Sequence, residues 1–179
     1  EALRQLPRSG LAPQHALARA VLAAEDQRFA EHQGFDPNQW QQVLAQAQLG
    51  NAQLRGASTL TQQLAKLMFT DGERSALRKL RELLYAVEME ETLGKARILQ
   101  LYLAHAPWGE GVVGAEAAAQ HYFARPAARL TVAQAVWLAA MLNAPDRHAS
   151  RWQALGHVDL PRAHWVAQQL RTVNGVGLR

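Results

Sequence analysis

The sequence predicts a mainly α-helical protein that forms a single domain. Apolar residues recur at the spacing of a helix face through most of the 179 residues. Residues that commonly start or end helices separate these segments. Alternating apolar and polar runs, which would indicate strands, are scarce. A chain of this length can also bury a substantial core, so one domain is the simplest organisation.

The composition fits a folded globular protein and leaves the class of partner open. Hydrophobic residues make up 49% of the chain and charged residues 19%, which argues against disorder. The 19 basic and 15 acidic residues give a net charge of +4. This excess favours anionic partners without choosing between nucleic acid, phospholipid headgroups and a diphosphate. The absence of cysteine excludes disulfides and thiolate chemistry.

The N-terminal third contains two predicted helices. The spacing of apolar residues predicts a helix from Leu17 to about Glu31. A second helix is predicted from Asp36, a preferred N-cap that is followed by proline, to Gly50 as terminator. Residues 50–57 are expected to form a loop.

The middle of the chain contains two more predicted helices. Thr59 is the expected N-cap of the first, because Gln62 stands in the capping-box position three residues later. The sequence Asp71-Gly72 breaks this helix, and residues 74–93 form the next, which a glycine closes. The apolar row of that helix consists of Leu77, Leu80, Leu84 and Val87.

Four further helices are predicted at about 95–105, 114–123, 131–142 and 161–173. The longest apolar run begins at Leu130 and is interrupted by polar residues. It is shorter than the roughly 18 residues that a membrane-spanning helix requires. We therefore expect a buried helix there and no membrane-spanning segment within these residues.

The motif "AAEDQRFAEHQGFD" places a carboxylate beside an apolar helix face. On the predicted helix, Glu25, Phe29 and His32 fall within about 40° of one another. Val21 lies one turn before Glu25, so this carboxylate would be partly desolvated, as a general acid or base should be. The alternative is an ordinary boundary glutamate that pairs with Arg28.

The motif "GASTLTQQLAKL" combines hydroxyls, amides and one lysine. Ser58 and Thr59 stand at a predicted helix N-terminus, where backbone N–H groups favour an anion. Gln63 and Lys66 share a face one turn further along. Neutral donors with a single lysine suit a polar or phosphorylated ligand. The alternative is a capped helix with a solvated stripe.

A charged row follows in "GERSALRKLRELL". Arg74, Arg78 and Glu82 are four residues apart, and Lys79 precedes Glu82 by three. One interpretation is a cationic strip that holds phosphates while Glu82 works beside it. The alternative is an exposed ladder of salt bridges, because the row lies away from the leucines of the same helix.

Two other signals carry no function. The segment "GEGVVG" matches the dinucleotide-binding pattern G-x-G-x-x-G, but a helix-like run precedes it where a strand is required. A tight turn between helices is the better interpretation. The seven histidines show no metal-ligand spacing, so no protein-built metal site is predicted.

In their order along the chain, five segments resemble the motifs of peptidoglycan glycosyltransferases. This family comprises monofunctional cell-wall glycosyltransferases and the N-terminal domains of bifunctional penicillin-binding proteins. The segments are "EDQRFAEHQGFD", "GASTLTQQLAKL", "RKLRE", "ILQLYLAHAPWGEGVVGAEAAAQHYFARPAARLT" and "WLAAMLNAP". The resemblance covers about residues 14–148 of a single domain spanning 1–179.

This resemblance implies a lysozyme-like large lobe and a smaller, membrane-proximal jaw lobe around residues 36–57. There Trp40, Val43 and Leu44 would face lipid, or else pack in the core. Members of the family polymerise lipid II into β-1,4-linked glycan with inversion and release undecaprenyl diphosphate.

The resemblance also implies roles for individual residues. Glu25 would be the base that deprotonates the 4-hydroxyl of the acceptor, and Glu82 would assist near the donor diphosphate. Phe29 and His32 are expected among the substrate-binding residues. The remaining expected substrate-binding residues are Lys66, Arg74, Arg78 and Lys79 as cations, and Ser58, Thr59 and Gln63 as hydrogen-bonding partners.

Partners and location follow from the same resemblance. A divalent cation, Mg²⁺ or Mn²⁺, would be held mostly by the substrate diphosphate, and no organic cofactor is expected. The partners would be lipid II, the growing lipid-linked glycan, the membrane surface and other cell-wall synthesis proteins, but not nucleic acid. The domain would work on the outer face of the bacterial cytoplasmic membrane, anchored by an N-terminal helix that this chain lacks.

Three positions depart from the family pattern. Leu67 and Ala104 stand where asparagine is usual, and Gln100 stands where glutamate is usual. We expect these changes to lower activity without changing the reaction class. The alternatives are an inactive descendant that binds lipid II or glycan, or serves as a scaffold, and a lysozyme-like hydrolase. The cationic row argues against the hydrolase, because glycan cleavage releases no diphosphate.

Overall fold

The computed structural model describes residues 5–6, 9–37, 41, 58–69 and 76–172. Its elements in chain order are α2 (Ala16–Glu25), α4 (Leu60–Phe69), α5 (Ala76–Leu93), α6 (Lys95–His105), α7 (Ala115–Phe123), the 3-10 helix η1 (Ala127–Arg129), α8 (Val132–Met141), α9 (Pro145–Leu155) and α10 (Pro161–Thr172). No strand occurs in this part of the chain, only one isolated bridge. The prediction of a mainly α fold is therefore confirmed.

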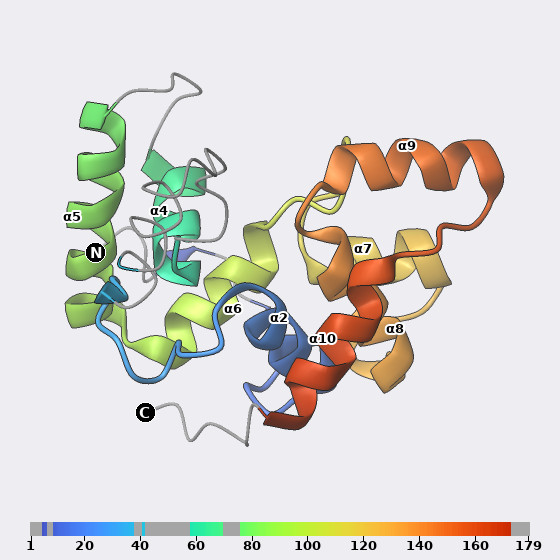
Figure 1. The fold of residues 1–179 in the computed structure, drawn as a ribbon, viewed down its shortest axis with the longest axis horizontal. Coiled ribbons are helices and arrows are strands. Elements are labelled where there is room, and N and C mark those ends of the chain that lie inside the picture. The colour runs from blue at the N-terminus through green and yellow to red at the C-terminus, as the bar shows by residue number, and fades with distance from the viewer. Residues whose placement is uncertain (1–4, 7–8, 38–40, 42–57, 70–75, 173–179) are drawn as a thin grey trace.

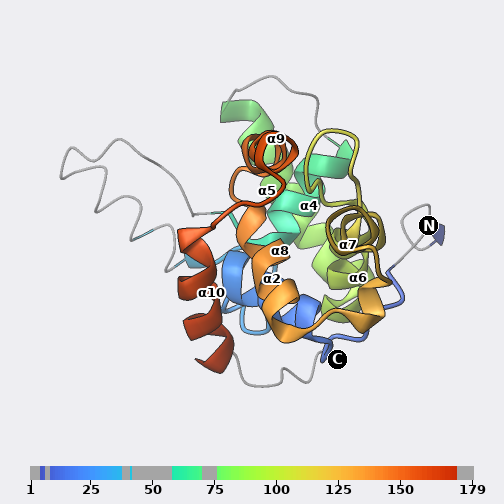
Figure 2. The same cartoon turned by 90° about the vertical axis from the view of Figure 1, so that its right-hand side faces the viewer.

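The helices form two groups that α6 joins. Helices α4 and α5 lie side by side in one group, and α2, α8 and α10 pack against one another in the other (Figure 1). Helix α6 contacts α4 and α5 at one side and α7 at the other. The view turned by 90° shows α10 covering one face of the pair formed by α2 and α8 (Figure 2).

The core is built largely from leucines and alanines of α2, α6 and α8. Seven of the ten residues of α2 are buried, and six of the ten residues of α8. Leu17, Leu101 and Leu138 are completely buried. Each such side chain contributes about 1.5–3 kcal/mol to stability through burial alone. The small alanines between them let the helix backbones approach closely.

Helix α2 ends at Glu25, six residues before the predicted end at Glu31, so that prediction was wrong. Asp26 leaves the helical conformation with φ −158° and ψ 79°. Its carboxylate instead accepts a hydrogen bond from the backbone N–H of Leu60 at 2.8 Å. A contact with the start of α4 therefore ends α2. Glu25, Phe29 and His32 consequently do not share a helix face.

The predicted capping box at the start of α4 is confirmed. The backbone N–H of Gln62 donates to Oγ1 of Thr59, and the backbone N–H of Thr59 donates to Oε1 of Gln62, both at 3.2 Å. Both side chains are buried. Two N–H groups that a helix start would leave unpaired are thereby satisfied.

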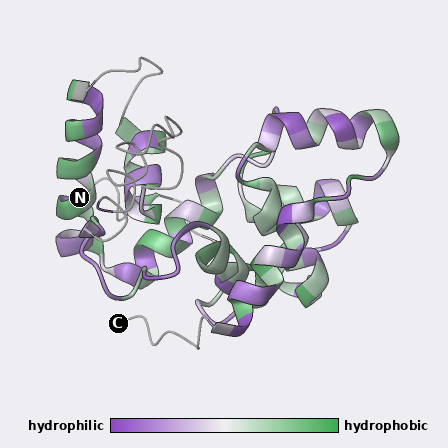
Figure 3. Cartoon of the chain, in the orientation of Figure 1, coloured by the Kyte–Doolittle hydropathy of each residue, from purple (hydrophilic) through white to green (hydrophobic). Residues whose placement is uncertain are grey.

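Helix α5 presents the opposite face to the one its leucines suggest. Leu77, Leu80 and Leu84 are 57%, 51% and 61% exposed. The face that packs against α4 and α6 carries Glu82, which is 3% exposed, followed by buried Ala86 and Met89. Figure 3 shows the resulting alternation of hydrophobic and hydrophilic bands along α5. The described members of the charged row, Arg78, Lys79 and Glu82, are therefore partly or fully buried and do not form an exposed ladder.

The remaining predicted helices are confirmed, and α9 was not predicted. A glycine with φ 74° separates α5 from α6, and the segment "GEGVVG" forms the turn between α6 and α7. Helix α9 buries only His148 and Ala149, so it has almost no apolar periodicity. Its signal was Pro145 at the first position and Gly156 just after the end.

Several predictions fall outside the described residues. These are most of the helix over 36–50, the loop over 50–57, the jaw lobe with its three apolar residues, the break at Asp71-Gly72, and Arg74. The division into two lobes remains a prediction for the same reason. Within the described residues, no helix has the length and apolar character that crossing a membrane requires.

Gly34 allows the segment after α2 to lie directly on the backbone of α5. A Cβ at this position would lie 2.8 Å from the carbonyl carbon and oxygen of Ala86, and φ is +81°. We expect Gly34→Ala to lower the free energy of unfolding by more than about 2 kcal/mol. Gly156→Ala is the matched control, because its φ is +69° but no atom lies within 4 Å of the added Cβ. Urea unfolding of both variants separates the cost of the steric clash, present only at Gly34, from the cost of backbone strain, present at both positions. Equal losses in the free energy of unfolding would show that the clash costs nothing.

Candidate active site

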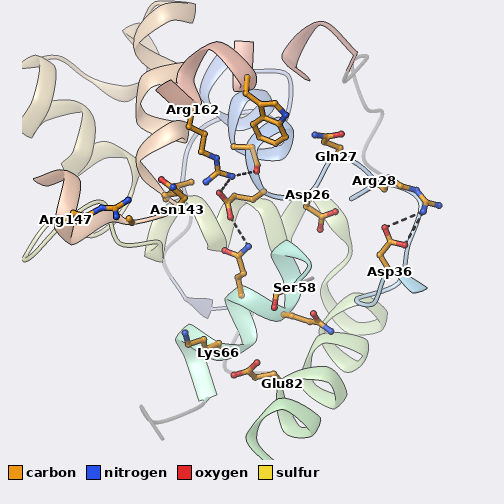
Figure 4. Close-up of a pocket in the computed structure, with 17 residues that line it drawn as sticks. Asp26, Gln27, Arg28, Asp36, Ser58, Lys66, Glu82, Asn143, Arg147 and Arg162 are labelled. Atoms are coloured by element: carbon orange, nitrogen blue, oxygen red, sulfur yellow. Dashed lines mark hydrogen bonds and ion pairs between the residues drawn. The ribbon is translucent and has the colours of Figure 1, made fainter. Parts of the chain in front are cut away.

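A cleft of about 970 Å³ opens between the two helix groups. Its walls come from the end of α2, from α4 and α5, and from the turn after α8 together with α9 and α10. Figure 4 shows Asn143, Arg147 and Arg162 on one side, and Ser58, Lys66 and Glu82 on the other. The lining residues are Ala24, Glu25, Asp26, Gln27, Arg28, Asp36, Ser58, Gln62, Gln63, Lys66, Glu82, Leu142, Asn143, Ala144, Arg147, Arg162 and Trp165.

Glu25, the last residue of α2, lies in this cleft with its carboxylate held from two sides. Nε2 of Gln63 donates to Oε2 at 3.0 Å. Nη2 of Arg162 lies 3.2 Å from Oε1, and the Glu25 side chain is 11% exposed. Gln63 donates a hydrogen bond to the carboxylate and Arg162 forms an ion pair with it, so the two residues fix its position in the cleft.

Arg162 is a cleft residue that the sequence did not single out. It is the second residue of α10. In addition to its contact with Glu25, its Nη2 donates to the carbonyl oxygen of Ala24 at 2.6 Å. The guanidinium lies 5.5 Å from the ring centre of Trp165, which also lines the cleft. No local feature of the sequence distinguishes Arg162 from the other arginines, because its partner lies 137 positions away.

Glu82 anchors a cationic cluster on the opposite wall. Nε of Arg78 lies 3.1 Å from its Oε1, and Nζ of Lys79 lies 3.2 Å from its Oε2. Nζ of Lys79 also donates to Oγ of Ser58 at 2.8 Å. The side chain of Lys79 is 34% exposed, so its charge remains accessible to an anion. Two cations around one carboxylate leave a net positive charge in this part of the site.

Asp26 is a second residue that the sequence did not single out. It is 1% exposed, and Nε2 of His32 lies 2.9 Å from its Oδ2, the same oxygen that accepts the N–H of Leu60. Asp26 therefore joins the end of α2 to the start of α4, which carries Gln63. Its only signal in the sequence was its position next to Glu25.

The other predicted site residues are divided between the cleft and its support. Gln63, Lys66 and Ser58 line the cleft. Phe29 and His32 are buried behind it, and Nζ of Lys95 lies 4.4 Å from the Phe29 ring centre. Thr59 is also buried outside the cleft lining, and its hydroxyl donates to the carbonyl oxygen of Gly34 at 2.8 Å. The contacts of these three with substrate stay predictions.

The wall that α8 and α9 provide contains a histidine with an altered proton affinity. Nε2 of His148 lies 3.1 Å from Oδ1 of Asn143, which lines the cleft. Burial lowers the pKa of His148, and the positive charges of Arg147, Arg151 and Arg162 lower it further. The neutral ring is therefore favoured in the folded protein.

This shift predicts a pH-dependent loss of stability. Below the ordinary histidine pKa of about 6.5, the unfolded chain binds a proton that folded His148 resists, so the free energy of unfolding decreases as the pH falls. We expect His148→Gln to reduce this loss between pH 7.5 and 5.5, measured as the urea midpoint at each pH. The exposed His157→Gln is the control. Parallel pH curves for the native protein and His148→Gln would contradict the prediction.

Most of the described carboxylates that line the cleft are paired with other groups of the protein. No group of three or more potential metal ligands occurs in the part of the chain that the structure describes. Both oxygens of Glu82 face cations, and Asp26 is occupied by His32 and Leu60. Asp36 is paired with Arg28 at 3.2 Å. These residues do not fit a protein-held divalent ion.

The fold and the cleft define an enzyme-like helical domain with a carboxylate on one wall and a cationic cluster on the other. Such an arrangement can remove a proton from a hydroxyl and neutralise an anionic group. The family model described as Transglycosylase matches residues 4–171. The chain belongs to this family, which confirms the resemblance found in its motifs.

Curated relatives agree with this membership. The chain is 50% identical over 141 residues to a protein of Bordetella pertussis named biosynthetic peptidoglycan transglycosylase, covering 75% of this chain and 58% of that protein. It is 46% identical over 158 residues to a protein of the same name from Klebsiella oxytoca, covering 88% of this chain and 64% of the relative. The chain thus spans about six-tenths of the length of these relatives.

Proposed function

We propose that the chain is the catalytic domain of a peptidoglycan glycosyltransferase. It would polymerise lipid II into β-1,4-linked glycan with inversion at the donor carbon and release undecaprenyl diphosphate. The observation that carries this proposal is the cleft that Glu25 and Glu82 both line, in which Gln63 and Arg162 contact Glu25 while Arg78 and Lys79 pair with Glu82. The names of the relatives support the same reaction class.

In the proposed reaction, Glu25 takes the proton of the acceptor 4-hydroxyl. The oxygen then forms a bond to the donor anomeric carbon as the bond from that carbon to the diphosphate breaks. The leaving diphosphate gains negative charge, which Lys79 and Arg78 would stabilise. Inversion requires the base and the leaving group on opposite faces of the sugar, so in this proposal the sugar would lie between Glu25 and the cations around Glu82.

A divalent cation would enter this reaction only with the substrate. The described carboxylates do not fit a protein-held ion, so Mg²⁺ or Mn²⁺ would be bound mainly by the diphosphate oxygens. Lys66 lines the same cleft and would add to the charge around that group. The protein's part is then to hold the diphosphate, and no step of our mechanism depends on the metal.

The three departures from the family pattern lie outside the cleft lining. Leu67 is 42% exposed on α4, and Gln100 and Ala104 lie on α6. None of these three residues is among the described contacts of Glu25 or Glu82. Their position favours an active enzyme over a binding module that has lost its catalytic groups.

The exposed leucine row of α5 supports work at a membrane surface. Leu77, Leu80, Leu84 and Val87 form an apolar face on the outside of the domain. An enzyme that uses a lipid-linked substrate has to work close to the membrane. The outer face of the bacterial cytoplasmic membrane is the proposed location. Sedimentation of the protein with anionic lipid vesicles tests this, and recovery of all protein in the supernatant would oppose it.

The function is tested by incubating the chain with fluorescent lipid II and Mg²⁺ and separating the products on a gel. Glycan polymer is the expected result and would establish the transferase. Tight binding of lipid II without polymer would instead indicate a binding module. Shortening of added glycan strands, with no use of lipid II, would indicate a hydrolase.

A further inference from the structure

A chain of hydrogen bonds runs from the interior of the protein to Glu25. The hydroxyl of Tyr102, on α6, donates to Oε1 of Gln63 at 3.0 Å. The amide nitrogen of Gln63, on α4, donates to Oε2 of Glu25 at 3.0 Å. Tyr102 is 3% exposed and does not line the cleft. Three helices thus contribute to the position of one carboxylate.

The chemistry of these groups gives the chain a direction. A side-chain amide has one end that accepts and one end that donates, whereas a carboxylate only accepts. Burial raises the pKa of Tyr102 well above its ordinary value, and the charge of Glu25 raises it further. The hydroxyl therefore stays protonated and can donate. A donating hydroxyl at one end requires the amide nitrogen of Gln63 to face Glu25 at the other.

We propose that Tyr102 is a positioning residue for the base, because its hydroxyl holds the Gln63 amide with the nitrogen toward Glu25. The role of Glu25 as the base rests on the function proposed above, whereas the orientation of Gln63 does not depend on it. Tyr102 does not touch substrate. It acts through Gln63 by keeping a donor, and not a carbonyl oxygen, against the carboxylate.

Loss of the hydroxyl should change how readily Glu25 accepts a proton. Without Tyr102 as donor, the Gln63 amide can rotate and bring Oε1 against the carboxylate. Two oxygens in contact favour the protonated carboxyl, since it can then donate. The only charged group with a described contact to Glu25 is Arg162 on α10, and it stays in place. The other charged residues that line the cleft are Asp26, Arg28, Asp36, Lys66, Glu82 and Arg147.

The test compares Tyr102→Phe with Tyr122→Phe. The control removes a similarly buried hydroxyl, which donates to the carbonyl oxygen of Trp108 at 2.6 Å and lies outside the cleft lining. We expect Tyr102→Phe to lower kcat for lipid II polymerisation by about 10-fold or more, as is common for residues that orient a reactive group. The acidic limb of its pH–rate profile should move to higher pH. Tyr122→Phe should change neither.

A second readout does not depend on activity. The side-chain carboxyl carbon of Glu25 is followed by NMR in protein labelled with ¹³C-glutamate, and Glu25→Gln assigns the signal. Its titration midpoint should move to higher pH in Tyr102→Phe and stay in place in Tyr122→Phe. An unchanged midpoint and pH profile in Tyr102→Phe would overturn the positioning role while the proposed function stands. No polymer from the native chain would overturn the function, and the NMR midpoint would still decide the role of Tyr102.

Discussion

Replacing Glu25 by glutamine is expected to lower glycan synthesis from lipid II by about 10²–10⁴-fold, the usual contribution of a general base. The amide has no basic oxygen and cannot take the proton of the acceptor hydroxyl. Its amide nitrogen would also lie against the amide nitrogen of Gln63, which now donates to the carboxylate at 3.0 Å, or against Nη2 of Arg162, which now lies 3.2 Å from it in an ion pair. The initial rate of polymer formation at saturating lipid II measures the effect.

The control for this prediction is Glu110→Gln. Glu110 is an exposed glutamate in the turn between α6 and α7, outside the cleft lining, so the same chemical change should leave the rate within about twofold. Binding of lipid II to Glu25→Gln should be retained, since the cationic cluster around Glu82 is untouched. A variant at Glu25 that makes polymer at nearly the native rate would remove this residue from the role of base.

Replacing Asp26 by alanine is expected to lower the free energy of unfolding by about 3–5 kcal/mol, the cost of removing one member of a buried pair. Asp26 is 1% exposed, and its loss leaves the N–H of Leu60 and Nε2 of His32 without their partner. An unpaired buried donor retains its full desolvation cost. The midpoint of urea unfolding measures the change, and Asp26→Asn should lie between the two proteins because its oxygen can still accept from Leu60.

Asp159→Ala is the matched control for stability. Asp159 is exposed between α9 and α10, so its replacement should change the free energy of unfolding by no more than about 0.5 kcal/mol. Asp26→Ala should also lose polymerising activity under conditions where it remains folded, because the contact to Leu60 sets the start of α4 relative to Glu25. Native stability in Asp26→Ala would show that this contact does not hold the two helices together.

Much of the fold could be predicted from the sequence because its signals act over a few residues. The capping box of Thr59 and Gln62 closes within one helical turn, and it formed as predicted. The pairs that Glu82 forms with Arg78 and Lys79 are likewise local, three and four residues apart on one helix. The glycine pattern after α6 was rejected as a dinucleotide-binding loop because the residues before it were predicted to be helical, and α6 is indeed a helix.

The candidate site could be predicted only in part. The motifs identified Glu25, Gln63 and Lys66, which line one cleft. They did not reveal Arg162 and Tyr102, whose hydrogen-bonding partners on α2 and α4 lie 138 and 39 positions away. No periodicity of a single segment encodes such a contact. These two residues reach their partners on α4 and α2 only because α6 and α10 pack where they do.

The sequence by itself therefore determined the helical class, most of the described helix boundaries, and the local pairs around Glu82. Tertiary structure decided which face of α5 is buried, since the leucine row and the row of Glu82, Ala86 and Met89 both have helical spacing. It also decided that α2 stops at Glu25, because Asp26 caps α4 in place of continuing its own helix. The physical reason is the same in both cases: a side chain's environment depends on the elements packed against it, and those elements are distant in the chain.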